Sequence, residues 1–475
     1  MADLLDFLHS EPLFDPVNDT DKEFDQNIRR FASQLKKYPN KSFVGEINGQ
    51  SILMYLDPSK NTIGYLHVLL AYVDHELLVQ VSLFLESFDP VQARYVGEEW
   101  RTLLVNMISV SDRNGTAAQA IHPIRTAILR MDPSSSTFTT NHLYFLRMCL
   151  NAGMPRQTLP ILDKDIYSFP AQSPKGVDER YPCSDHEVSC NYITKNSGIS
   201  EQITPMQVQE YYLLGAHVYI GVRQYERARL FLELVLSSPT QHVATPMMVE
   251  AYKKLILVGL LSQGATFKLP GTIDHGTLRT VQQLSRAYEA LADAFKNRDF
   301  VKFHAETDTG IAIWREDGNQ GIVNEVAEAL NRSRIKDLQK TYSALPLERV
   351  AIHLSLSQDS TMRLLTAMIQ QNHISATITL PTASQPNPAN GTSPSAVLRF
   401  VPSASANGNV LTEEALLQSR VEMIKHLNAQ LKEADRKLSL TKEYIDWKKR
   451  NQKADPGDRM DTSLDMPGVM ARTRI

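Results

Sequence analysis

Apolar side chains recur at steps of three and four residues along most of this chain, and this period limits the folds open to it. Nearly every segment from Glu23 to Tyr342 repeats the pattern over about 10 to 20 residues and then meets a short connector. Residues at such steps share one face of an α-helix, so helices must supply the core. One set predicted to share a single helix face is Val281, Leu284, Tyr288, Leu291 and Phe295.

The predicted helices come in pairs. Residues 211–221 and 225–236 form one pair, which partly fits the tetratricopeptide pattern of an aromatic residue, a leucine and small residues at set intervals. Because small residues let two helices approach closely, the pattern favours an array of helical repeats. A non-repetitive helical globule is the alternative. The matching residues are Tyr211, Leu214 and Gly215, with Ala228, Leu232 and Pro239 one residue late.

Turn-forming residues mark where the helical pattern starts and stops. Thr245 supplies a hydroxyl N-cap and Pro246 a first helical residue, and Gly264 is a plausible end for the helix that they begin. Residues 169–200 carry several prolines and glycines with little periodicity. They predict a long loop between two groups of helices.

The period changes after the long helical region. Two short helices are predicted over residues 346–354 and 359–371, the second capped by Asp359. Two runs rich in β-branched and aromatic residues follow at 374–380 and 396–401, and they predict strands. The order helix, helix, strand, long hairpin, strand is typical of a winged helix. The hairpin loop, or wing, is unusually long here.

A last helix is predicted from about Thr412, a candidate N-cap, to Lys449. Apolar side chains recur along it at the heptad spacing of a coiled-coil or bundle seam, which Ala434 and Thr441 weaken. At about 1.5 Å per residue the helix extends roughly 55 Å, so its apolar face favours burial against partner helices. Folding back on its own domain is the alternative. The predicted contact residues are Leu417, Val421, Ile424, Leu427, Leu431, Leu438 and Ile445.

These patterns predict a mostly α chain in which a right-handed array of helical repeats, similar to tetratricopeptide or HEAT repeats, precedes a winged helix and a long terminal helix. We expect the following segments: N-terminal repeats over 1–205, with the loop 169–200; a second domain over 206–402, made of a helical part 206–340 and a winged helix 341–402 with its wing loop 381–395; a bundle helix within 403–450; and a disordered tail over 451–475.

Charge and cysteine content exclude several classes of protein. The 50 basic and 53 acidic residues give a formal charge of −3, which excludes a strongly basic chain held to nucleic acid by overall charge. The candidate recognition helix 359–371 has one basic residue, Arg363, so we expect no nucleic-acid partner. Three cysteines in 475 residues exclude a disulfide framework and suit a reducing compartment.

No positively charged leader opens the sequence, and the most apolar stretch, 63–73, is too short to cross a membrane. We therefore expect a protein of the cytoplasm and nucleus without a membrane partner.

Enzyme motifs are missing from the sequence. It has no His-x-His, no G-x-x-x-x-G-K-[ST] phosphate loop, no G-x-G-x-x-G and no G-x-S-x-G. The best metal candidate, Cys183 with His186 and Cys190, offers three ligands in a loop where zinc usually takes four, and ordinary free thiols are the favoured interpretation. We expect Cys149 in the core and His217 packed inside the repeat. No catalytic residue, metal or cofactor is predicted.

The combination of helical repeats, winged helix and terminal helix resembles the PCI family, whose members are scaffold subunits of the proteasome lid, the COP9 signalosome and translation initiation factor three. Four stretches are similar to a COP9 signalosome subunit of that family, and the similarity extends in order over roughly residues 60–450. They are LPILDKDI (159–166), YYLLGAHVYIGVRQYERARLFLELVLSSPT (211–240), EAYKKLILVGLL (250–261) and DGNQGIVNEV (317–326).

The resemblance implies a non-catalytic scaffold subunit of the complex that removes Nedd8 from the cullins of cullin–RING ubiquitin ligases. It implies that the catalytic zinc site lies in another subunit, and that the partners are other PCI and MPN subunits and, indirectly, neddylated ligases. The winged helix is then expected to contact a neighbour through Ile374, Ala376, Ile378, Val397 and Phe400.

Three rival functions remain open at this point: a PCI subunit of the proteasome regulatory lid, a nucleic-acid-binding winged-helix protein, and a metalloenzyme that uses the Cys183 cluster.

Overall fold

The computed structural model contains two compact units, residues 1–406 and 407–475, and each is described by itself. The described residues are 2–13, 20–39, 42–44, 46–47, 50–72, 78–171, 181–186, 188–239, 243–354, 356–370, 374–379, 396–400, 413–439 and 444–447. The predicted wing loop 381–395, the tail 451–475 and Thr412 lie outside these ranges. Within them, every helix is too short or too polar to cross a lipid bilayer.

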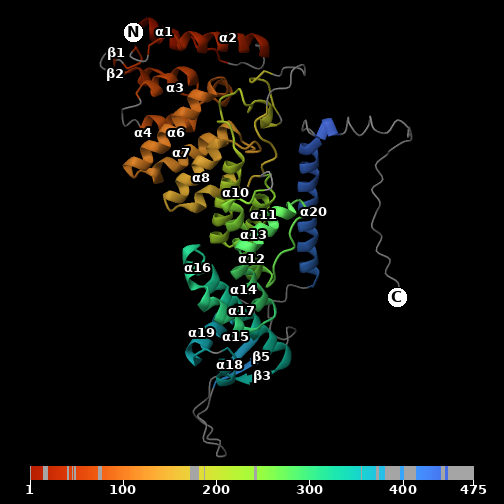
Figure 1. Ribbon diagram of the computed structural model, residues 1–475. Coiled ribbons are helices and arrows are strands. Elements are labelled where there is room, and N and C mark those ends of the chain that lie inside the picture. The colour runs from red at the N-terminus through yellow and green to blue at the C-terminus, as the bar shows by residue number, and fades with distance from the viewer. Residues whose placement is uncertain are drawn as a thin grey trace, which may run out of the picture. The chain divides into compact units, whose positions relative to one another are not determined.

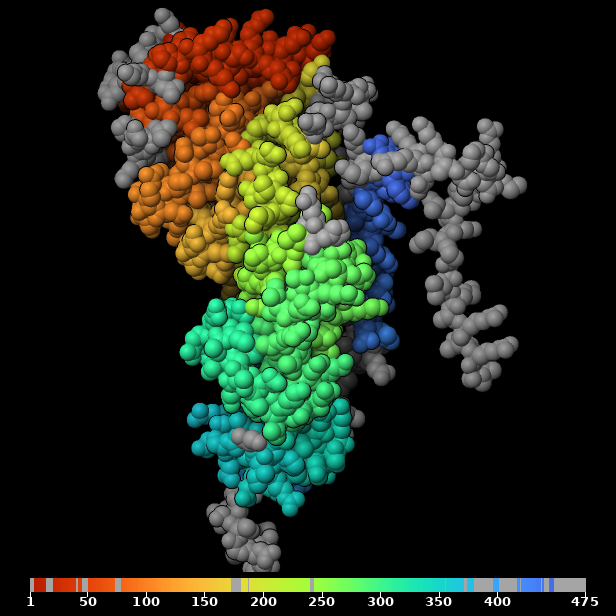
Figure 2. Space-filling view, in the orientation of Figure 1, coloured from red at the N-terminus to blue at the C-terminus, as the bar shows by residue number. Residues whose placement is uncertain are grey.

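Helices dominate the first unit, as predicted. Figure 1 shows an elongated stack that begins with α1 and α2 and ends at a small sheet. In Figure 2 the colours of this unit follow one another along the stack, so segments near in sequence also pack near in space, as in a helical-repeat array. The elements before the long loop are α1 (Ala2–His9), α2 (Asp21–Leu35), η2 (Ile52–Tyr55), α3 (Thr62–Ala71), α4 (Leu78–Ser87), α5 (Pro90–Ala93), η3 (Arg94–Val96), α6 (Gly97–Asn114), α7 (Ala117–Met131), α8 (Thr140–Asn151), η4 (Pro155–Thr158) and α9 (Leu159–Leu162).

A short hairpin interrupts these helices. The strands β1 (Glu46–Ile47) and β2 (Gln50–Ser51) pair antiparallel between α2 and η2. This hairpin is an exception to the helical pattern predicted for nearly every segment from Glu23 to Tyr342. Strands of two residues each are too short to produce an alternating sequence pattern.

The N-terminal segment is tied to α3 by a buried carboxylate. The backbone N–H groups of Ile63 and Gly64 donate to Glu11 Oε1 and Oε2 at 2.8 and 3.0 Å. The first N–H groups of a helix have no partner within it, so Glu11 satisfies two donors that burial would otherwise leave unpaired. Gln92 adds a second tie, because its Nε2 donates to the carbonyl oxygen of Pro12 at 3.2 Å.

Helix α8 joins two hydrophobic cores. Its Phe145 and Cys149 side chains lie in the core of the N-terminal helices, whereas Leu143 and Leu146 lie in the core of the helices that follow. Both faces of α8 are therefore apolar, and the stack continues through it without a break. The expectation that Cys149 is a core residue is confirmed, and burial raises the pKa of its thiol to about 12.

The described part of the predicted loop 169–200 is packed on the N-terminal helices. The guanidinium of Arg94 lies 3.9 Å from the ring centre of Tyr192 and donates to the carbonyl oxygen of Pro182 at 2.8 Å. The Tyr192 hydroxyl donates to Met131 O at 3.0 Å, and Ile199 is buried. The described residues of this segment contain the single helical turn η5 (Ser189–Asn191), so the loop prediction holds for their backbone, while their side chains complete the first core.

The second core is built around α12, most of whose residues between Met248 and Leu260 are buried. Thr245 Oγ1 accepts the Met248 N–H at 3.3 Å, Pro246 is the first helical residue and Gly264 has a φ of +71°, so the predicted start and stop are confirmed. The elements of this region are α10 (Pro205–Val222), α11 (Tyr225–Leu236), α12 (Pro246–Ser262), α13 (His275–Leu284), α14 (Arg286–Lys296), α15 (Phe300–Thr309), α16 (Ile311–Glu316) and α17 (Gln320–Thr341).

The predicted tetratricopeptide-like pair is formed by α10 and α11. A Cβ atom added at Gly215 would lie 2.7 Å from the ring of Phe231. The glycine is therefore required by the close approach of the two helices. The absence of a side chain lets the aromatic ring rest on the α10 backbone.

One predicted helix is two helices. Val281 and Leu284 lie on α13, whereas Tyr288, Leu291 and Phe295 lie on α14. Ser285 separates them with φ −112° and ψ 19°, which is outside the helical region. The helix direction changes at this residue, so Val281 stays buried while Leu284 is 62% exposed.

The first unit ends in a small α/β module. Its sheet is antiparallel in the order β3-β5-β4, with Leu345 opposite Leu398 and Ile378 opposite Leu398. The two helices and two strands expected from the sequence are present, and the third strand, β3, was not expected. Ser357, not Asp359, begins the second helix, since its Oγ accepts the Ser360 N–H at 3.2 Å. The elements are β3 (Ala344–Pro346), α18 (Leu347–Leu354), α19 (Gln358–Gln370), β4 (Ala376–Thr379) and β5 (Val397–Phe400).

The second unit contains one long helix, α20 (Glu413–Ser439), and a described helical segment at 444–447. The predicted long terminal helix is therefore present over most of its described length.

Replacing Gly215 by alanine should lower the free energy of unfolding by about 1–3 kcal/mol, because the new methyl group overlaps the Phe231 ring. Chemical denaturation followed by circular dichroism measures the change. Gly221, on the same helix, is the matched control because a Cβ atom added there would have nothing within 4 Å. Gly221→Ala should instead add about 0.5–1 kcal/mol. Equal effects at both sites would contradict the close approach.

Raising the pH should weaken the attachment of the N-terminal segment. Burial raises the pKa of Glu11 from 4.5 to about 8. The folded state therefore holds this proton more tightly than the unfolded state, so the stabilisation is complete below pH 4.5 and is lost as the pH rises towards 8. Denaturation at about pH 6 and about pH 9 should differ by a few kcal/mol at most. Glu11→Gln should remove this part of the pH dependence, and an unchanged dependence in that variant would contradict the assignment.

Candidate interaction surfaces

The cysteine and histidine candidates are engaged in structural contacts. Cys183 is buried, its Sγ donates to the carbonyl oxygen of Asp21 at 3.4 Å, and burial raises the pKa of its thiol. His186 Nε2 lies 2.9 Å from Tyr181 O, and Cys190 Sγ lies 3.9 Å from the side-chain oxygen of its neighbour. Among the residues that the structure describes, no three His, Cys, Asp or Glu side chains are grouped so that they could hold a metal ion.

His217 lies at a helix–helix contact inside the repeats, as expected. Its Nε2 is 3.2 Å from Glu250 Oε1 on α12. The nearby imidazole and the Lys254 ammonium lower the pKa of this carboxyl. The residue therefore helps to join α10 to α12.

A buried polar network brings together two of the sequence stretches that carry the family resemblance. Lys254, 7% exposed, donates to Asn319 Oδ1 at 2.8 Å, and Asn319 Nδ2 donates to the Tyr288 hydroxyl at 2.8 Å. That hydroxyl donates to Asp317 Oδ2 at 2.7 Å, and both oxygens of Asp317 accept hydrogen bonds from Lys253 at 2.8 Å. The network connects α12, α14 and the turn before α17.

Buried charges of this kind also occur in active sites, so the partners of Lys254 decide whether the network is structural or catalytic. Burial lowers the pKa of Lys254 because it penalises the charged form, while Glu250 at 3.6 Å opposes the shift. Each polar group named in the network bonds to another member of it. The arrangement satisfies buried donors and acceptors and fixes three helices in register. The sequence signal was the lysine pair inside the apolar run EAYKKLILVGLL, which we did not interpret as a polar contact.

The predicted contact residues of the winged-helix strands have two different environments. Ile374, Ala376 and Phe400 are at most 9% exposed and form part of the module's own core with Leu398. Their side chains are therefore not available at a surface, because alternate residues of a strand point to one face and this face is covered by α18 and α19.

Ile378 and Val397 are half-buried. Val397 lies next to Leu398 on β5 and so points to the outer face, where Thr379 is its cross-strand partner. The strand β4 lies at one edge of the sheet, whose order is β3-β5-β4. On α19, Arg363 is exposed, whereas Leu365 and Met368 are buried.

The seven apolar residues predicted for the terminal helix form an exposed stripe. Six lie on α20, and Ile445 lies in the described segment 444–447. Their exposed fractions range from 40% at Ile445 to 62% at Leu417. The heptad spacing places the six residues on α20 along one side of that helix, and we call these six together with Ile445 the α20 stripe. It is the largest aligned set of exposed apolar side chains on any described helix.

Comparisons with known proteins bear on the same features. A family model described as COP9 signalosome complex subunit 3, N-terminal helical repeats, matches residues 25–275. Two relatives are named COP9 signalosome complex subunit 3. The protein of Emericella nidulans is 32% identical over 369 residues, which is 74% of each chain. The protein of Neurospora crassa is 24% identical over 454 residues, which is 89% of this chain and 87% of the relative.

The matched region contains the N-terminal core, α10 to α12 and the tetratricopeptide-like pair. The family match covers more than half of the chain, and the similarity to the relatives extends beyond it. The family resemblance found in the sequence is thereby confirmed. This chain belongs to the family of COP9 signalosome complex subunit 3.

Proposed function

We propose that this chain is a non-catalytic scaffold subunit of the COP9 signalosome, the complex that removes Nedd8 from the cullin subunits of cullin–RING ubiquitin ligases. The names of both relatives support membership of the complex. The observation that carries the scaffold role is the α20 stripe. An exposed apolar face of this length marks a surface that another protein covers.

Burial of the stripe would contribute favourable free energy to assembly. Full burial of a leucine or isoleucine side chain contributes about 1.5–3 kcal/mol, and roughly half of each side chain is still exposed here. Seven residues could then supply several kcal/mol before the cost of association is subtracted. The flank of the helix is charged, with Arg436 Nε 3.3 Å from Glu433 Oε2, so only one face is suited to burial.

The winged-helix module supplies a second contact of a different kind. Its apolar strand residues are used in its own core, so we propose that β4 and the outer face of the sheet meet a neighbouring module through backbone hydrogen bonds. A strand at the edge of a sheet has N–H and C=O groups that another strand can pair with.

We propose that the catalytic zinc site of the complex lies in another subunit. Lys254 and Tyr288, whose pKa values are shifted, bond to Asn319 in the network that fixes the positions of three helices, which supports a structural role for these groups. The proposed partners are other PCI and MPN subunits and, indirectly, neddylated cullin–RING ligases. The proposed location is the cytoplasm and nucleus.

Purification of the tagged full-length chain from its own cells should recover signalosome subunits, and its deletion should raise the neddylated fraction of cullins. Mass spectrometry of the purified material and immunoblotting of cullins measure the two outcomes. Recovery of proteasome lid subunits in their place, with unchanged cullin neddylation, would favour the rival assignment.

Aspartate at both Leu431 and Leu438 should release the chain from its complex while the helical repeats stay folded. Two carboxylates in the seam cannot be buried without partners, and their desolvation opposes assembly. Size-exclusion chromatography of cell extracts should move the variant from the complex to the free fraction, with an unchanged thermal unfolding of the repeats.

The matched control places the same number of aspartates on the other side of the helix. Gln418 and Ala429 are exposed and lie away from the stripe by helical spacing. Gln418→Asp with Ala429→Asp should therefore assemble like the natural chain. If both double variants assemble, or neither does, the stripe is not the contact.

A further inference from the structure

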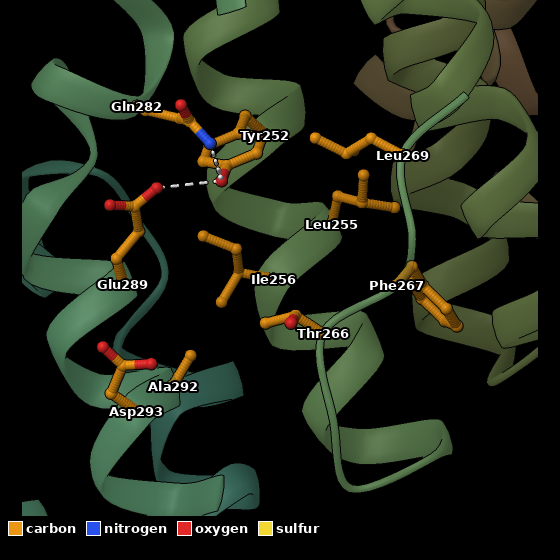
Figure 3. A pocket seen from close by; sticks show the side chains of 10 residues that line it. All are labelled: Tyr252, Leu255, Ile256, Thr266, Phe267, Leu269, Gln282, Glu289, Ala292 and Asp293. Carbon is orange, nitrogen blue, oxygen red and sulfur yellow. Dashed lines mark hydrogen bonds between the residues drawn. The ribbon is translucent and has the colours of Figure 1, made fainter. Parts of the chain in front are cut away.

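A preformed cavity lies between α12, α14 and the loop that joins α12 to α13. Figure 3 shows its arrangement: Leu255 and Ile256 at the back, Glu289 and Asp293 on one wall, and Phe267 and Leu269 on the other. The cavity has a volume of about 360 Å³, near the lower end of the roughly 300–1,000 Å³ of ligand pockets. It therefore fits one or two large side chains and is too small for a helix.

The loop wall is fixed by packing. A Cβ atom at Gly259 would lie 2.7 Å from the carbonyl oxygen of Ala265, so the loop rests directly on the α12 backbone. Phe267 is only 9% exposed, and the guanidinium of Arg229 lies 4.5 Å from its ring centre. Because this wall is already ordered, little conformational entropy is lost from it when a ligand binds.

The opposite wall carries negative charge without a matching cation. Glu289 and Asp293 are four residues apart on α14, so they lie on one face, where like charges repel. Neither forms a salt bridge with a described residue, and the residues that line the cavity include no lysine or arginine. The nearby Arg229 is already paired with Glu233 at 2.7 Å.

One carboxylate is oriented towards the cavity by a buried hydroxyl. Tyr252 donates to Glu289 Oε1 at 2.9 Å, and Gln282 Nε2 in turn donates to the Tyr252 oxygen at 3.4 Å. Burial raises the pKa of Tyr252 to about 12, so the hydroxyl keeps its proton near neutral pH. The second oxygen of Glu289 is left to accept hydrogen bonds from a ligand.

We infer that this cavity binds an arginine and its apolar neighbour from an extended segment of a partner protein. An arginine side chain has an apolar stem and a planar cationic end, which match the floor of Leu255 and Ile256 and the paired carboxylates. The apolar neighbour rests against Phe267 and Leu269. The inference goes beyond the proposed scaffold contacts and does not depend on them, because the cavity lies within the first unit.

The test uses the full-length chain and the peptide acetyl-Gly-Leu-Arg-Gly-amide in a ligand-observed NMR titration. Binding at millimolar concentration is expected for a contact of this size. The same peptide with citrulline in place of arginine keeps the shape but loses the charge, and it should bind at least fivefold more weakly. Raising the salt concentration from about 50 to about 500 mM should also weaken binding of the arginine peptide.

Protein variants test whether the two carboxylates bind the peptide, independently of the fold. Glu289→Gln with Asp293→Asn should weaken binding about tenfold, and glutamine can still accept the Tyr252 hydrogen bond. Asp308→Asn, at an exposed carboxylate on α15 that does not line the cavity, is the control and should bind like the natural chain. Absence of binding, or equal binding by both peptides or by all three proteins, would overturn the inference. Equal binding of argininamide alone would also overturn it, because it would identify a site for free cations.

Discussion

Burial of one helix face against the next is the interaction on which the first unit depends. Helix α8 contributes Phe145 to one core and Leu146 to the other, so neither core is complete without it. Helix α12 is buried over most of its length, and its buried Lys254 has Asn319 and Glu250 as partners within the protein. The polar network is a consequence of this burial. Its members hold α14 and the start of α17 at fixed positions around the central helix.

The sequence predicted those features that depend on local spacing. The bounds of α11, the cap and stop of α12 and the α20 stripe all follow from residues a few positions apart. The break at Ser285, the strand β3 and the packing of Tyr192 against Arg94 depend on contacts between distant segments, which a periodic pattern does not encode. The cavity also depends on such contacts, since residues of α12, α13, α14 and the loop between α12 and α13 line it.

The exposure of the candidate contact residues could be predicted for the terminal helix but not for the strands. On a helix that does not pack on the chain's own core, apolar side chains stay at the surface. Their heptad spacing in the sequence identifies them. In the winged-helix module the same apolar character marks residues of the internal core, as it does for Ala376 and Phe400. Sequence alone does not distinguish an internal core residue from a contact residue on a strand. The alternation shows which residues share an apolar face, but the same alternation results whether the chain itself or a partner covers that face.

The tie between Glu11 and the start of α3 joins the segment after α1 to the helices of the first core. In stacked helical repeats the outermost unit leaves an apolar face that could accept another copy. Here α1 places Leu4 and Leu8 in the first core, with Leu8 against Gly64 of α3, and the Glu11 side chain accepts hydrogen bonds from the buried donors at the start of α3. This part of α3 is therefore covered by side chains of the same chain.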